Sequence, residues 1–183
     1  MKMNQVLAAV LIAGAALGWA SGPAQAALPV GATAPEFTTQ ASLAGKPMPF
    51  DLDAVLAKGP VVLYFYPAAF TKGCTIEAHD FAEATADFNK LGATVVGVSK
   101  DPIDKLNKFS VSECRNKFAV ASADATVISE YDVQLPIIGR ANRTSFVIAP
   151  DHKIIFVYSA MDPAGHVEKT MAAVKAWRAA HGT

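Results

Sequence analysis

The feature that most constrains the fold is a pair of apolar runs separated by a helical pattern. Residues 60–67 read PVVLYFYP and residues 93–99 read ATVVGVS, and both are rich in β-branched or aromatic side chains. Such runs are typical of strands buried on both faces. Between them, apolar residues recur every three to five positions over 75–91, and Gly92 stands where a helix should end. We therefore expect two parallel strands joined by a helix at the centre of a sheet.

The remaining periodicities extend this strand–helix alternation. They predict an extended segment at residues 30–40, a short strand at 118–122 and a short helix at 123–133. A strand hairpin at 144–159 and an amphipathic helix at 163–181 follow. Alternating strands and helices imply a mostly parallel sheet, and a late hairpin adds antiparallel strands. The predicted class is α/β, a thioredoxin-like three-layer α/β/α fold with a central mixed sheet.

Several residues are candidates for helix starts and sheet edges. Pro49 indicates an edge, because proline cannot donate a ladder hydrogen bond. Asp51 or Asp53 could start a short helix. Ser99 and Asp101 are possible caps of a further helix that is predicted to follow the second apolar run.

The first 26 residues have the layout of a secretory signal peptide. Lys2 is followed by the small and apolar run Val6–Ala20, and Ala24–Ala26 gives the small-x-small pattern of a cleavage site. The run is short for a membrane span, which leaves an uncleaved anchor as the alternative. We expect one domain at 27–183 and, from the alanine-rich composition, a location in a bacterial periplasm.

The charge balance favours no polyanionic partner. The chain holds 16 basic and 16 acidic residues, and loss of Lys2 with the signal peptide leaves 15 against 16, a net charge of −1. We therefore expect no binding to nucleic acid and no membrane contact after cleavage.

Two cysteines, Cys74 and Cys114, remain in a compartment that permits disulfides. A structural disulfide and a working thiol pair are both open at this point. Cys74 follows the first apolar run where a helix begins, and a helix N-terminus favours a thiolate over a thiol. Pro67 ends the strand, Gly73 allows a tight turn, and Thr71 can place a hydroxyl near the sulfur or near a substrate oxygen.

The segment PAAFTKGC (residues 67–74) resembles the peroxiredoxin pattern of proline, three residues, threonine, two residues and cysteine. The wider segment VLYFYPAAFTKGCTIEAHDF is similar to the branch of bacterioferritin comigratory proteins, also called PrxQ. GATAPEF, GATVVGVSKDPIDKLNKF and RTSFVIAPDHKIIFVY resemble further segments of that branch, so the likeness covers roughly residues 30–178 in order.

The resemblance implies a thiol-dependent peroxidase with no cofactor and no metal. Cys74 would be the peroxidatic cysteine, and Pro67, Thr71 and an arginine would shape the site and donate to the peroxide oxygens. Arg143, just before the strand TSFVIA, is the expected arginine, and Arg140 is the rival. The family resemblance also implies a peroxide substrate, a thioredoxin-like reductant and a monomer.

Glu77 falls at a commonly acidic position of the family, and either an exposed helix charge or a site residue is expected there.

Many members of this branch carry a resolving cysteine five residues after the peroxidatic one, and here His79 occupies that position. His79 is expected to be an ordinary helix residue. Some relatives instead place the resolving cysteine in the helix after the second strand, which makes Cys114 the expected partner of Cys74. A spectator role for Cys114, with an external thiol completing the cycle, is the alternative.

Three other functions compete with the peroxidase. A thioredoxin-fold binding or structural domain would hold Cys74–Cys114 as a permanent disulfide. A disulfide oxidoreductase is disfavoured because Thr71 stands where the first cysteine of Cys-x-x-Cys would be. A cysteine hydrolase would need His166 or His181 as its base, and both are expected on the solvated face of the last helix.

Overall fold

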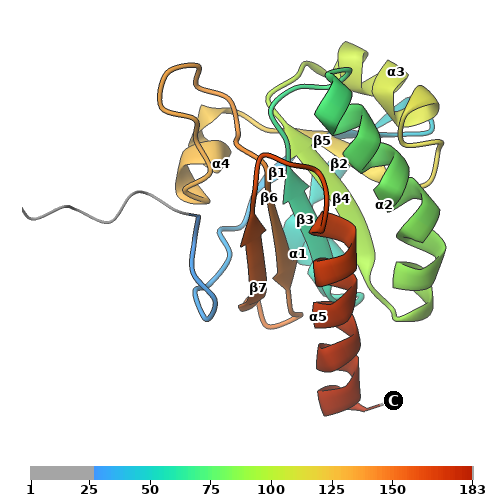
Figure 1. The fold of residues 1–183 in the computed structure, drawn as a ribbon, viewed down its shortest axis with the longest axis vertical. Helices are drawn as coiled ribbons and strands as arrows, with labels where there is room; N and C mark the ends of the chain where they lie inside the picture. Colours follow the sequence, from blue (N-terminus) through green and yellow to red (C-terminus); the bar gives the residue numbers. More distant parts are fainter. Residues whose placement is uncertain (1–26, 183) are drawn as a thin grey trace, which may run out of the picture.

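The run at 60–67 forms the centre of a seven-stranded mixed sheet (Figure 1). The structure, a computed structural model, describes residues 27–182, so the predicted signal peptide lies outside the described residues. The central strand pairs in parallel with the strand formed by 94–99 and antiparallel with the first strand of the predicted hairpin. The sheet order is β2 (Lys46–Asp51), β1 (Thr38–Leu43), β5 (Ala119–Ser122), β4 (Thr94–Ser99), β3 (Val61–Phe65), β6 (Thr144–Ile148) and β7 (Ile154–Ser159).

Helices cover both faces of the sheet and make three layers. Because successive strand side chains point to opposite faces, Leu63 of β3 enters one core and Tyr64 the other. The first core is closed by α1 (Leu52–Leu56) and α4 (Ala125–Glu130). The second is closed by α2 (Lys72–Lys90), α3 (Ile103–Ser112) and α5 (His166–His181). The predicted thioredoxin-like α/β/α class with a mixed sheet is confirmed, but the expectation of a mostly parallel sheet is wrong, because only the pairs β3–β4 and β4–β5 of the described sheet are parallel.

The N-terminal part of the sheet is more regular than its sequence indicates. The extended segment predicted at 30–40 continues into β1, which turns at Ala44 and Gly45 and pairs with β2. That hairpin was not predicted, because the two prolines of β2 conceal a strand pattern. Pro49 does lie on an edge strand, as expected. Asp51 caps α1 by accepting from the backbone N–H groups of the second and third residues after it.

The expectation that Ser99 or Asp101 caps α3 is wrong. The N-cap position is taken by Pro102, and no side chain caps the helix. The Asp101 carboxylate instead accepts from the Ser99 hydroxyl at 3.0 Å and from the backbone N–H of Ala69 at 2.7 Å. Asp101 therefore ties the carboxyl end of β4 to the loop that follows β3.

The last helix begins three residues later than predicted. Residues 160–165 form a loop that ends at Gly165 with φ of 86°, and His166 is the first helical residue. Within residues 27–182, none of the helices has the length and apolar character needed to cross a bilayer.

Candidate active site

Cys74 lies in the first turn of α2, directly beyond the carboxyl end of β3. Its side chain is 1% exposed. The first backbone hydrogen bond of this turn runs from the N–H of Thr75 to the carbonyl of Thr71. The N–H groups before it, including those of Gly73 and Cys74, have no partner within the helix, and their dipoles favour negative charge close by. The predicted position of the cysteine at a helix start is confirmed.

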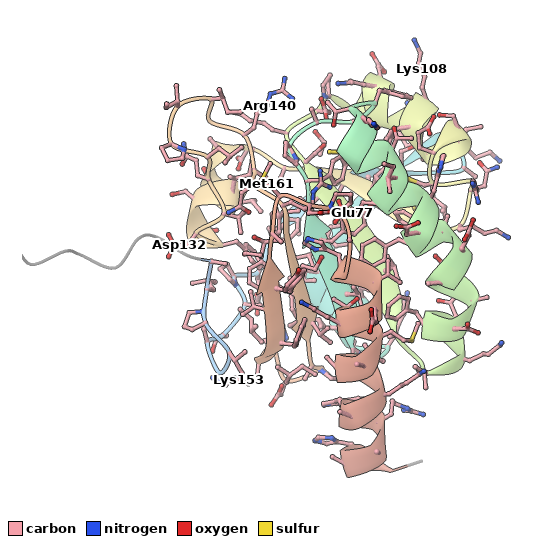
Figure 2. The ribbon with its side chains drawn as sticks, in the orientation of Figure 1. Glu77, Lys108, Asp132, Arg140, Lys153 and Met161 are labelled. Atoms are coloured by element: carbon pink, nitrogen blue, oxygen red, sulfur yellow. The ribbon has the colours of Figure 1, made fainter. Side chains whose placement is uncertain are left out.

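A buried arginine joins the cysteine to a buried carboxylate. The Nη2 atom of Arg143 lies 3.5 Å from the Cys74 sulfur, and its Nη1 atom donates to Oε2 of Glu77. Both charged side chains are almost fully buried. Of the two arginines that the sequence offered, Arg143 is therefore the one beside the sulfur. The expectation of an exposed charge at Glu77 is wrong, because one turn into α2 this position faces the sheet and the start of α5 (Figure 2).

The backbone around Gly73 leaves room for the guanidinium. A Cβ atom added at Gly73 would lie 2.9 Å from Nη2 of Arg143. The guanidinium is fixed from its other side by Nε, which donates to the carbonyl of Met161 at 3.0 Å. Gly73 therefore serves a close approach of Arg143 as well as the predicted tight turn.

The loop between β3 and α2 is held by polar contacts as well as by the packing of Ala69 in the core and of Phe70 on Phe109. Besides the bond from Ala69 to Asp101, the carbonyl of Pro67 accepts from Arg140 at 3.2 Å. Arg140 is also 3.6 Å from the Asp101 carboxylate. It therefore supports the loop, and of the two arginines it is Arg143 that contacts the sulfur. The Thr71 hydroxyl donates to the carbonyl of Ala68 at 2.9 Å, which turns its lone pairs outward.

Burial sets the protonation of Glu77. Its pKa rises from 4.5 to about 8 because the carboxyl is removed from water, an effect that the Arg143 guanidinium opposes. The side chain is 0% exposed, and its Oε1 atom has no hydrogen-bond partner among the described residues.

The prediction of a solvated face for His166 is wrong. The side chain is 0% exposed, because the first residue of α5 packs against the sheet where Ala160 and Ser145 meet it. Its Nδ1 atom lies 3.5 Å from Oε1 of Glu77. His181, at the other end of the helix, is exposed as expected.

Cys114 occupies the turn after α3, within the region predicted for it. It is a free thiol, as is Cys74, and both pack in the core cluster on the α2 side of the sheet. Burial, and to a smaller extent the Glu113 carboxylate, raises the pKa of the Cys114 thiol well above its usual range, which keeps it protonated. His79, expected to be an ordinary helix residue, pairs with Glu113 at 2.8 Å and so links α2 to the turn that carries Cys114.

The phenols of Tyr64 and Tyr66 interact electrostatically with both cysteines. Burial raises the pKa of each phenol well above its usual range, and charge on either sulfur adds to the shift.

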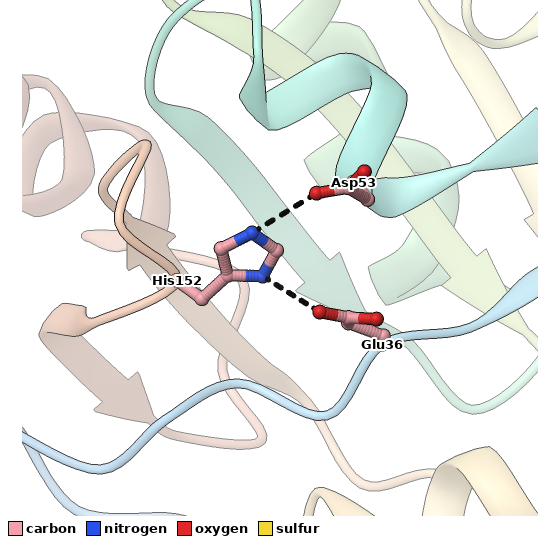
Figure 3. A group of neighbouring side chains, drawn as sticks. All are labelled: Glu36, Asp53 and His152. Atoms are coloured by element: carbon pink, nitrogen blue, oxygen red, sulfur yellow. Dashed lines mark ion pairs between the residues drawn. The ribbon is translucent and has the colours of Figure 1, made fainter.

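A second cluster of titratable groups lies at the opposite end of the sheet (Figure 3). His152, in the turn between β6 and β7, is 3.1 Å from Asp53 through Nε2 and 3.5 Å from Glu36 through Nδ1. The two ring nitrogens point to different carboxylates, so the ring bridges α1 and the N-terminal segment with two ion pairs. Each of the three residues offers one possible metal-ligand atom, and these atoms lie within 4.8 Å of one another.

Asp101, Ser145 and His166 were not recognised as site residues from the sequence. Asp101 follows β4, and strand carboxyl ends are where α/β folds gather functional groups, so its position was an available signal. No pattern marked Ser145, and His166 entered only as the possible base of a cysteine hydrolase, because its position depends on the loop that folds α5 back onto the sheet.

A thioredoxin-like sheet that sets a cysteine at a helix start, under a buried arginine, defines a cysteine-dependent redox protein. The AhpC/TSA family model matches residues 30–157. A Mycobacterium tuberculosis protein classed among the peroxiredoxins is 38% identical over 136 residues, which are 71% of this chain and 87% of that protein. Peroxiredoxin Bcp of Escherichia coli is 31% identical over 112 residues, 58% of this chain and 72% of its own length.

The crystal structure of peroxidoxin BcpB from Mycobacterium tuberculosis superposes with a TM-score of 0.74 at 35% identity, covering 80% of this chain and 96% of that one. The chain therefore belongs to the AhpC/TSA family, in the Bcp and PrxQ branch of the peroxiredoxins. The predicted family is confirmed, and with it the class of thiol-dependent peroxidases.

Replacing Gly73 by alanine should displace Arg143 from the sulfur, because the new Cβ lies inside contact distance of Nη2. We expect the second-order rate constant of Cys74 oxidation by hydrogen peroxide to fall by roughly tenfold or more. Thermal unfolding should change little, since alanine favours a helix. Ile76→Ala, on the exposed side of the same turn, is the matched control. An unchanged rate in Gly73→Ala would show that the position of Arg143 does not govern the reaction.

Proposed function

We propose that this peroxidase reduces hydrogen peroxide and organic hydroperoxides through the thiolate of Cys74. The observation that carries the proposal is the contact of the Arg143 guanidinium with the Cys74 sulfur at 3.5 Å, in a site where both groups are buried. A positive charge that is fixed beside the sulfur favours the thiolate, which is the nucleophilic form.

In the proposed reaction, the sulfur attacks one peroxide oxygen and the oxygen–oxygen bond breaks. The second oxygen leaves with the bonding electron pair, takes up a proton and departs as water or an alcohol. Cys74 is thereby oxidised to a sulfenic acid while the peroxide is reduced. Negative charge builds on the leaving oxygen, so donors that are fixed before the reaction lower the barrier.

Three groups are placed to supply those donors. The guanidinium of Arg143 lies beside the sulfur, and the N–H groups of the first turn of α2, which carries Cys74, have no partner within the helix. Thr71, as the N-cap residue of α2, can redirect its hydroxyl from the Ala68 carbonyl to a substrate oxygen. Pro67 lies in the loop between β3 and α2 and would shape the pocket around the sulfur.

We further propose that Cys114 resolves the sulfenic acid. Its thiol would attack the Cys74 sulfenic sulfur, release water and form a Cys74–Cys114 disulfide, which the dithiol of a thioredoxin-like protein would then reduce. Both thiols belong to one core cluster, which supports the pairing. A disulfide requires Cα atoms within about 7 Å of each other, and Cys114 is buried and protonated, so the turn that carries it must open first.

The backbone of that turn favours such opening. Arg115 and Asn116 hold positive φ angles of 51° and 59°, which are costly for residues other than glycine. The turn is attached to α2 by the pair of Arg115 with Glu83 at 2.9 Å and by that of Glu113 with His79. The first of these pairs is exposed and contributes little to stability.

A count of free thiols tests both cysteine roles. Pre-reduced protein should lose two thiols within seconds of adding one equivalent of hydrogen peroxide. Cys74→Ser should lose none, and Cys114→Ser should stop at a sulfenic acid that a dimedone probe traps. Sulfenic acid at Cys74 without a Cys74–Cys114 disulfide would establish a one-cysteine cycle. If Cys74 reacts no faster than a free thiol, the alternative of a structural domain with a permanent disulfide takes its place.

The two arginines near the site offer a matched comparison. Arg143→Gln should lower the rate constant for peroxide by roughly a hundredfold, the loss typical of removing one fixed donor at a developing charge. Arg140→Gln should change it far less, because Arg140 contacts the loop carbonyl and not the sulfur. Arg143→Lys keeps a positive charge beside Glu77 and is the control for misfolding of Arg143→Gln. Equal effects at both positions would contradict the assignment of Arg143.

We also propose that residues 1–26 direct export to a periplasm and are removed, which leaves a monomer that begins at Ala27. The support is the sequence pattern of a charged start, an apolar run and a small-residue cleavage site. Mass spectrometry of the protein from a periplasmic fraction should give the mass of residues 27–183. Light scattering should give the molar mass of a single chain. A full-length mass in the membrane fraction would support the uncleaved anchor instead.

A further inference from the structure

His166 is a buried histidine with every polar contact fixed by the fold. Its Nε2 atom lies 3.0 Å from the carbonyl oxygen of Ala160, and its Nδ1 atom lies 2.8 Å from the hydroxyl of Ser145. The ring of Tyr158 packs edge-on against the imidazole, with centroids 4.8 Å apart. Because a carbonyl can only accept, Nε2 must carry a hydrogen, and in the neutral ring Nδ1 is then a bare acceptor.

The same Nδ1 atom faces Glu77. Oε1 of Glu77 is 3.5 Å from it and has no hydrogen-bond partner among the residues that the structure describes. Nδ1 accepts from the Ser145 hydroxyl and has no hydrogen to donate, so an ionised Oε1 would be a buried charged oxygen without a donor among the described residues. The arrangement therefore calls for a proton between Glu77 and His166.

The strand register brings the arginine and the histidine to one carboxyl group. Arg143 and Ser145 are two residues apart at the start of β6, so their side chains point to the same face of the sheet. Arg143 donates to Oε2 of Glu77, and Ser145 holds His166 next to Oε1. Three elements, α2, β6 and α5, thus converge on the two oxygens of Glu77 (Figure 2).

The environment places the proton on the glutamic acid. Burial raises the pKa of Glu77 to about 8, whereas burial lowers the pKa of His166. Both shifts favour a neutral imidazole beside a protonated carboxyl group at neutral pH. The other titratable groups that face this pair are Cys74 and Asp80 of α2, Tyr64 of β3, Arg143 before β6, Tyr158 of β7 and Lys169 of α5, and the backbone of Asp162 also contacts His166.

We infer that His166 is a positioning residue of the peroxidase site, which presents an acceptor and no donor to Oε1 of Glu77, so that Glu77 stays protonated and the positive charge of Arg143 stays directed at Cys74. A neutral Glu77 still accepts a hydrogen bond from Arg143 through Oε2 but does not cancel its charge. That charge is then available to the thiolate and to the leaving oxygen. This inference rests on the proposed function, because it assigns a role within the same site.

Two substitutions separate the roles of the two ring nitrogens. In His166→Asn, the side-chain oxygen can replace Nδ1 as the acceptor facing Ser145 and Glu77, and the contact with Ala160 is lost. In His166→Gln, the longer amide can replace Nε2 as the donor to Ala160, and the acceptor facing Glu77 is lost. His181→Gln is the control, because His181 lies at the exposed end of the same helix and does not contact the site.

The measurement is the second-order rate constant for hydrogen peroxide between pH 5 and 10, with the thermal unfolding midpoint of each variant. In His166→Gln, Glu77 should ionise at lower pH, since its proton has lost an acceptor. The rate at neutral pH should then fall roughly tenfold, and the decline at alkaline pH should begin about one pH unit lower than in the wild type. His166→Asn should stay within about threefold of the wild-type rate even if its unfolding midpoint is lower.

Two results would overturn the inference. One is a folded His166→Gln with the rate and the pH profile of the wild type. The other is a loss of rate in His166→Asn and His166→Gln alike that follows the loss of thermal stability, which would give His166 a structural role only. Failure of the proposed function is distinguishable, because the wild-type protein itself would then oxidise no faster than a free thiol.

Discussion

The buried pair of Arg143 and Glu77 is the interaction on which the site depends. A guanidinium is stable in a protein interior only if its charge and its hydrogen bonds are satisfied there. Glu77 and the Cys74 sulfur, both in α2, and the Met161 carbonyl, in the loop before α5, make those contacts. The first turn of α2, the start of β6 and the loop before α5 must therefore fold together before any of them is stable in this position.

The sheet topology makes that meeting possible. β3 and β6 are antiparallel neighbours, so the residue before β6 lies at the carboxyl end of β3, where α2 begins. The parallel neighbour β4 ends at the same edge. Asp101, two residues after β4, accepts from the N–H of Ala69 and so holds the loop between β3 and α2. One edge of the sheet thus receives the helix start, the arginine and the loop anchor.

The two cysteines illustrate how one core gives two thiols different environments. Cys74 has a guanidinium and a helix N-terminus beside it, whereas Cys114 has buried tyrosines and a neighbouring carboxylate. Favourable charge next to Cys74 supports a nucleophile that is ready in the folded state. Cys114 is buried, and the contact of His79 with Glu113 at 2.8 Å lies at the turn that carries it.

The sequence by itself determined the class of the fold, the position of Cys74 at a helix start and the preference for Arg143 over Arg140. The fold class and the position of Cys74 rest on local period and on a short motif, which act within one segment of chain, and the preference for Arg143 rests on the resemblance to the family. Only the tertiary structure decided that Glu77 and His166 are buried, that Asp101 holds a loop instead of capping a helix, and that Gly73 makes room for a guanidinium. Each of these depends on contacts between segments distant in sequence, and burial is a property of how helices pack on a sheet. A polar residue on an amphipathic helix has the same local pattern whether its neighbours are water or a buried arginine.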